Sequence, residues 1–221
     1  GLDPVIRVSG TEHLDAALAL ENGAILWAFP SRYGTIIGKM GLCQAGYQIS
    51  QLSRGGHGFG NGDFVQKHLN RFITDIEDRY LKERLTIVRG REMPTFRRMH
   101  QRLKENGIVS ISLVTEAEQI RMVPCLGGYL RMAAGAPNIA ITSGAALLPV
   151  QVLRQPDDSF DVTIFSPLTI PDEGGRVEKA NTILKEFVGK LEPLIQRHPD
   201  QCSPWGDLVE DVGAVESSAV S

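Results

Sequence analysis

Acid–base chemistry in this chain would depend on a glycine-rich segment, "SRGGHGFGNGD", at residues 53–63. His57 stands in the middle of it, and a histidine can take a proton from a hydroxyl group at neutral pH. Asp63 and Glu116 could orient the imidazole of His57 or accept a proton. These three residues are therefore the catalytic candidates. The alternative is that His57 is an exposed loop residue and that the glycines only form turns.

A second stretch, "WAFPSRYG" at residues 27–34, has the position of an active-site corner but lacks acid–base groups. It follows the apolar run "AILWAF" and precedes a helical pattern, and it contains no His, Asp, Glu, Cys or Lys. Arg32 and Tyr33 could polarise a carbonyl or donate a proton. They could equally be ordinary first-turn residues of the helix.

The elements that must position these residues alternate along the chain. Short apolar runs predict strands, and patterns of 3.6-residue period between them predict helices. The expected strands are 24–29, 47–52, 85–88, 108–114, 146–153 and 160–166. The expected helices are 11–22, 34–45, 64–81, 94–106, 136–143 and 179–197, and residues 115–130 read as irregular. This alternation predicts an α/β domain, a three-layer sandwich with a mostly parallel sheet, in which 160–166 is an antiparallel neighbour of 146–153.

In such a sheet the ligand lies beyond the carboxyl ends of the strands. The loops 29–34, 53–63 and 115–121 should therefore share one face. Phe29, Arg54 and Glu116 would then meet at one apolar-walled cavity.

Charge is distributed unevenly along a chain of 221 residues with a net charge of −3. Between Lys67 and Lys104 there are eleven Lys or Arg residues against five acids, and beyond Arg197 only acids occur. The basic stretch could attract an anionic ligand or an acidic partner, or it could be a solvated helix face. The overall charge gives no indication of nucleic-acid binding. We expect one domain over 1–208 and a disordered acidic tail over 209–221.

The three cysteines are widely spaced and lie outside any metal-ligand pattern, so we expect reduced packing residues, no metal and an intracellular protein. No apolar run approaches the length of a membrane span, and no signal-peptide pattern is present. The chain begins at Gly1 rather than Met, which leaves open a further N-terminal segment.

Three segments, in this order, resemble the lipid A biosynthesis acyltransferases of the lysophospholipid acyltransferase superfamily. They are "GTIIGKMGLCQAGYQISQLSR", "RMVPCLGGYLRMAAGAPNIAITSGAALLPVQVLRQ" and "NTILKEFVGKLEPLIQRHPDQCSPW". The resemblance covers residues 13 to 208. It implies an α/β sandwich that transfers a fatty acyl group from acyl carrier protein or a coenzyme A thioester to a hydroxyl, with no bound cofactor.

The family's general base is a His-x4-Asp/Glu motif at the end of the first strand. On this chain its two positions fall on Phe29 and Gly34, so both catalytic groups are absent. Arg54 matches the family's arginine at the end of the second strand, which makes it a candidate anion contact. Together with the corner residues Phe29, Arg32 and Tyr33, Arg54 is an expected substrate-binding residue.

Three interpretations of the missing base remain open. The base could have moved to His57. The chain could be an inactive homologue that binds an acyl chain or carrier as a scaffold or accessory subunit, since losing a general base costs about 10²–10⁴-fold in rate. The pocket could also serve altered chemistry, such as an amine acceptor. The expected partners are acyl carrier protein or coenzyme A and a lipid or small-molecule acceptor. The expected location is the cytoplasm, with peripheral contact to the inner membrane as an open alternative.

Overall fold

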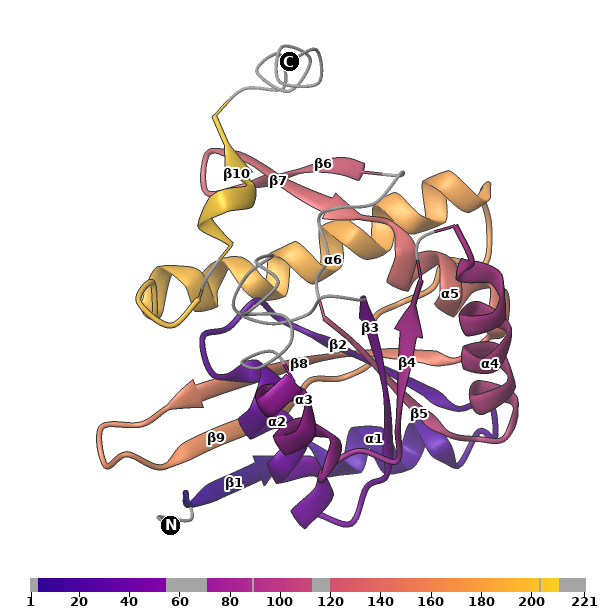
Figure 1. Ribbon diagram of the computed structural model, residues 1–221. Helices are drawn as coiled ribbons and strands as arrows, with labels where there is room; N and C mark the ends of the chain where they lie inside the picture. Colours follow the sequence, from indigo (N-terminus) through magenta and orange to yellow (C-terminus); the bar gives the residue numbers. More distant parts are fainter. Residues whose placement is uncertain (1–3, 55–70, 89, 113–119, 203, 211–221) are drawn as a thin grey trace.

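The structure is a computed structural model that describes residues 4–54, 71–88, 90–112, 120–202 and 204–210 (Figure 1). The side chains of Thr35, Arg54, Arg71 and Ile73 also lie outside this description. Within these ranges, no helix is long and apolar enough to cross a lipid bilayer.

A seven-stranded sheet forms the centre of the molecule, in the order β1-β9-β8-β2-β5-β3-β4. Its strands are β1 (Ile6–Ser9), β2 (Ala24–Ala28), β3 (Ile49–Arg54), β4 (Glu83–Ile87), β5 (Ile108–Ser112), β8 (Ala146–Arg154) and β9 (Phe160–Ile164). Every neighbouring pair is parallel except β8 with β9. The prediction of a mostly parallel sheet with one antiparallel neighbour is therefore confirmed.

Strand β2 shows why the apolar runs form the middle of this sheet. Its residues from Ala24 to Trp27 are all at most 1% exposed, and it pairs on one side with β8 and on the other with β5. A strand that is covered on both faces has no solvent side, so its sequence is continuously apolar rather than alternating.

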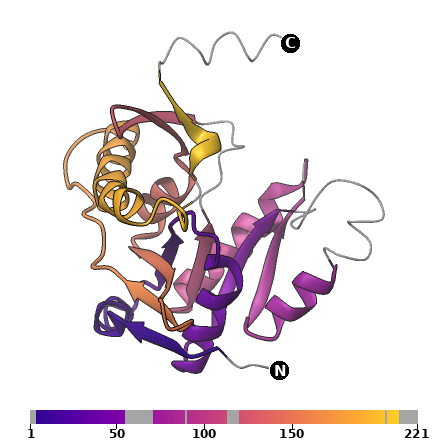
Figure 2. The same ribbon diagram turned by 90° about the vertical axis from the view of Figure 1, so that its left-hand side faces the viewer.

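Helices cover both faces of the sheet, as the two views in Figures 1 and 2 show. On one face α1 (Thr11–Leu18) and α2 (Gly34–Gln44) pack with Leu26 and Val150. Against α2 lies the short α3 (Arg71–Asp78). The other face is covered by α4 (Glu92–Lys104), α5 (Gly135–Ser143) and α6 (Arg176–Arg197), which pack with Trp27 and Leu147.

The segment predicted to be irregular is instead an antiparallel hairpin, so that prediction was wrong. It consists of β6 (Ile120–Cys125) and β7 (Gly128–Ala133), which form a three-stranded sheet with β10 (Leu208–Val209). Leu126 and Gly127 make the two-residue turn with φ of 51° and 80°, the left-handed conformation that tight hairpins require. Pro124 interrupts the residue pattern that would predict a strand. A proline is tolerated at this position because β6 is an edge strand of its sheet.

Other boundaries differ by a few residues. Helix α1 ends at Leu18, four residues before the predicted end, and α6 begins at Arg176 rather than at residue 179. The four-residue strand β1 was not predicted at all. The ordered pairing of β10 reaches Val209, one residue past the predicted domain end.

Candidate functional site

The carboxyl ends of β2, β5 and β3 lie side by side at one edge of the sheet. Ala28 of β2 is in register with Ser112 of β5, and Ile111 of β5 is in register with Leu52 of β3. The connections after β2 and β3 lead to α2 and α3 on one face, whereas the connection after β5 leads to the hairpin and α5 on the other. Neighbouring strands whose connections leave toward opposite faces create a crevice, and this is where α/β proteins bind ligands.

A cavity of about 30 Å³ lies at this edge, between α2 and the sheet. One side of it is polar and consists of Lys39, Gln51, Ser110 and Ser112. Its other walls are apolar or glycine, namely Leu26, Ala28, Phe29, Gly34, Gly38, Leu42, Ile49, Val150 and Val152. The volume corresponds to about two water molecules at ~10–15 Å³ each, so the cavity suits a small reacting group rather than a complete acyl chain.

Strand register explains how the polar residues come together. Ser110 of β5 pairs with Leu26 on one side and with Gln51 of β3 on the other. Because side chains on a strand alternate between faces, Ser112 shares the face of Ser110, toward α2. The two serines and the glutamine thus replace apolar residues on a sheet face that is otherwise core.

Helix α2 approaches this face closely because of its glycines. A Cβ at Gly38 would come within 3.3 Å of the Cγ2 atom of Val152. One turn further on, a Cβ at Gly41 would come within 2.8 Å of Ile6 on β1. The two glycines therefore let α2 pack close to the sheet, and Gly38 itself lines the cavity.

Lys39 belongs to a buried charge cluster. Its Nζ atom donates to Glu77 Oε2 at 2.8 Å, and Arg84 Nη2 donates to the same oxygen at 2.8 Å. Arg84 also donates to Asp78 at 2.8 Å and to Ser53 at 2.9 Å. Burial lowers the pKa of Lys39, and its hydrogen bond to Glu77 opposes that shift. The cluster ties α2 to α3 and β4 and holds an amino group beside the cavity.

The corner after β2 is packed with aromatic side chains. Phe29 is 3% exposed, and its ring lies 4.5 Å from the ring of Phe187 and 5.6 Å from that of Phe165. Trp27 stacks on Phe187 at 3.8 Å. The Phe29 ring therefore packs in the core cluster under α6, and Phe29 is also one of the residues that line the cavity.

The other two corner candidates point elsewhere. Arg32 is exposed, and its backbone N–H donates to the carbonyl of Gln201 at 2.9 Å. Tyr33 packs its ring 5.4 Å from Phe160 and hydrogen-bonds Arg154, which raises the pKa of that arginine. Neither Arg32 nor Tyr33 lines the cavity.

The remaining predicted residues cannot be placed in the site. His57, Asp63 and Glu116 lie outside the described residues. The backbone of Arg54 ends β3 at the same edge as Ala28, but its side chain is not described. The expected meeting of Phe29, Arg54 and Glu116 at one cavity thus stays a prediction.

The polar residues of the cavity were not predicted from the sequence. The alternating serines of "SISLV" in an otherwise apolar strand were one available signal. The other was Lys39, a lone charge among the apolar residues of its predicted helix. Neither signal gives the register that brings them together.

The cysteines of the described residues are not paired. All three cysteines are free, and burial raises the pKa of the Cys125 thiol to about 11 and also raises that of Cys202. Within the described ranges, no three His, Cys, Asp or Glu side chains gather closely enough to hold a metal ion. Comparison with known proteins found no family model that matches the chain and no matching curated protein.

Proposed function

We propose that this chain is an acyl-transfer protein with a lysophospholipid acyltransferase-like fold and a non-standard active site. The donor is the thioester of acyl carrier protein or coenzyme A, and the acceptor is a hydroxyl or an amine. The ordered resemblance of three segments to the lipid A acyltransferases motivates the proposal. The observation that carries it is the mainly apolar cavity with four polar lining residues, at the switch point of the sheet and beside the corner where the family keeps its base.

The proposed reaction gives a role to each candidate residue. The acceptor oxygen or nitrogen attacks the thioester carbonyl carbon, the C–S bond breaks, and the thiol leaves with the acceptor's proton. His57 takes that proton and passes it to the sulfur, oriented by Asp63 or Glu116. The hydroxyls of Ser110 and Ser112 and the Lys39 amino group are the donors available to the carbonyl oxygen.

A second candidate is a non-catalytic subunit that binds the acyl carrier or chain. The packing of the corner favours it, because Phe29 and Gly34 stand where the family has its base and carboxylate, and the Phe29 ring lies in the core. The two candidates share a ligand and differ only in turnover.

The test is an acyl-transfer assay with acyl carrier and coenzyme A thioesters and a panel of hydroxyl and amine acceptors. The His57→Ala variant should lose about 10²–10⁴-fold in rate. His13→Ala is the matched control, since His13 lies on α1 with its side chain 39% exposed and should leave the rate unchanged. Turnover that survives His57→Ala would refute the assignment of the base. Binding of the carrier without turnover would favour the non-catalytic subunit.

A further inference from the structure

Helix α4 has two distinct faces. Met99 and Leu103 are at most 1% exposed and pack against the sheet. A second, outer face beside the buried one carries a shallow hollow. Helix α4 itself lies at the outer edge of the molecule in Figure 1. Six side chains at helical spacing line this hollow, namely Met93, Phe96, Arg97, His100, Gln101 and Lys104.

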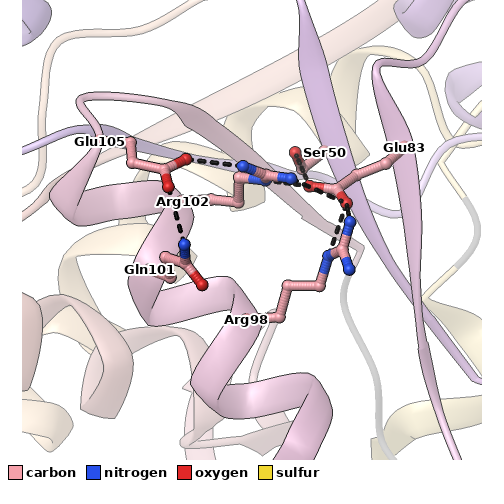
Figure 3. A network of polar contacts seen from close by, with 6 residues as sticks. All are labelled: Ser50, Glu83, Arg98, Gln101, Arg102 and Glu105. Carbon is pink, nitrogen blue, oxygen red and sulfur yellow. Dashed lines mark hydrogen bonds and ion pairs between the residues drawn. The ribbon is translucent and has the colours of Figure 1, made fainter.

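Some of the basic side chains in and beside this hollow form ion pairs with acidic residues, and others do not. Figure 3 shows Arg98 and Arg102 held by Glu83, and Arg102 also held by Glu105. Arg97 and Lys104, by contrast, are exposed and make no ion pair or hydrogen bond with any described residue. The hollow therefore has two free cations and no acid in its lining.

The hollow is also partly apolar at its N-terminal end. Met93 is 61% exposed although it is a large apolar side chain, and Phe96 next to it is half-buried. An exposed apolar group flanked by unpaired cations is the complement of a helix that carries apolar and acidic side chains on one face. A lipid surface is a poorer match. Helices that bind membranes present a broad apolar face that protrudes, whereas here only two apolar side chains, Met93 and Phe96, line a depression.

We infer that the outer face of α4, from Met93 to Lys104, is a docking surface for an acidic amphipathic helix of a partner protein. The unpaired Arg97 and Lys104 attract the acidic helix and set its orientation, and the hollow by Met93 and Phe96 receives one of its apolar side chains. The choice of probe rests on the proposed function, under which the acidic partner is the acyl carrier protein.

The experiment measures binding of acyl carrier protein to the whole chain by fluorescence anisotropy. Arg97→Glu combined with Lys104→Glu should weaken binding about tenfold or more, because each reversal replaces an attraction by a repulsion. Raising the salt concentration from about 0.05 to 0.5 M should weaken binding of the native chain and have less effect on the double variant. Lys185→Glu on α6 is the matched control, since it reverses another exposed cation.

The outcomes separate docking from catalysis. If the double variant binds the carrier as tightly as the native chain does, the docking surface is wrong, even where acyl transfer occurs. If the double variant loses carrier binding but keeps turnover with coenzyme A thioesters, both proposals stand. If the double variant loses carrier binding and the native chain shows no turnover, the docking surface is supported and the proposed enzymatic activity is refuted. Binding to anionic phospholipid vesicles that the same variant abolishes, without carrier binding, would assign the face to a membrane instead.

Discussion

Replacing Glu83 by Gln tests the charge network that joins α4 to the sheet (Figure 3). Glu83 begins β4, and its side chain is 15% exposed. It accepts hydrogen bonds from Arg102 Nε, from Arg98 Nε at 2.8 Å and from Ser50 Oγ at 3.1 Å. The hydrogen bond from Arg102 is the main cause that lowers the pKa of Glu83 to about 2.

The expected cost follows from the exposure of the two arginines. Arg98 is 59% exposed, so solvent screens its pair with Glu83, and that pair contributes less than about 1 kcal/mol. Arg102 is only 21% exposed, and the variant leaves its guanidinium without a charged partner in the sheet. We expect Glu83→Gln to lower the free energy of unfolding by about 1–3 kcal/mol at pH 7.

The loss of stability caused by Glu83→Gln should decrease as the pH falls. The pKa of Glu83 in the folded chain is about 2, below its unfolded value, so the carboxylate stabilises the fold fully above the unfolded pKa. That contribution is lost as the pH falls from about 5 toward 2. The difference between native chain and variant should therefore be constant from pH 6 to 7 and shrink at about pH 3.

Urea denaturation followed by circular dichroism at several pH values measures this difference. Glu173→Gln is the control and should change little, because Glu173 is exposed and makes no ion pair or hydrogen bond with a described residue. Equal stability of native chain and Glu83→Gln at pH 7, or a deficit that persists unchanged at about pH 3, would mean that the Glu83 carboxylate does not stabilise the fold through these arginines.

Two further predictions concern α2. Gly41→Ala should destabilise the fold by about 1–3 kcal/mol in thermal denaturation, because its Cβ would meet Ile6 at 2.8 Å, whereas Gly189→Ala on α6, with nothing within 4 Å, should be neutral or stabilising. A Gly41→Ala chain that melts at the native temperature would contradict the close approach of α2 to β1. Lys39→Met should lower the free energy of unfolding, measured by urea denaturation, by about 1–3 kcal/mol. This is less than the loss expected when a buried charge has no partner left, because Arg84 still donates to Glu77. A larger loss would mean that Arg84 alone does not compensate the charge of Glu77.

The parts of the fold that could be predicted are those with strong local patterns. The apolar runs of β2 and β8 and the glycine-flanked helix α2 were placed within a residue or two, because burial on both faces and helix stops leave direct signals. The hairpin of β6 and β7 was missed because Pro124 and a glycine turn interrupt its alternation. Strand β1 was not predicted because its four residues are too few to show a clear alternation of apolar and polar side chains.

The location of the candidate site could be predicted from the sequence, but its lining residues could not. Parallel topology alone required the ends of β2, β3 and β5 to share an edge. The polar side of the cavity was not predictable, because it depends on register between Ser110 and Gln51 and on an ion pair between Lys39 and Glu77, 38 positions apart. The burial of Phe29 likewise depends on Phe187, on a helix at the far end of the chain.

We propose that the reacting acyl group binds in the cavity between α2 and the carboxyl edge of the sheet. The most direct measurement is the change in backbone amide NMR shifts when a non-hydrolysable acyl-pantetheine thioether is added. The largest changes should cluster at Gly34, Gly38, Gln51, Ser110 and Ser112, which line the cavity. Changes confined to residues away from that edge, or no changes at millimolar ligand, would contradict it.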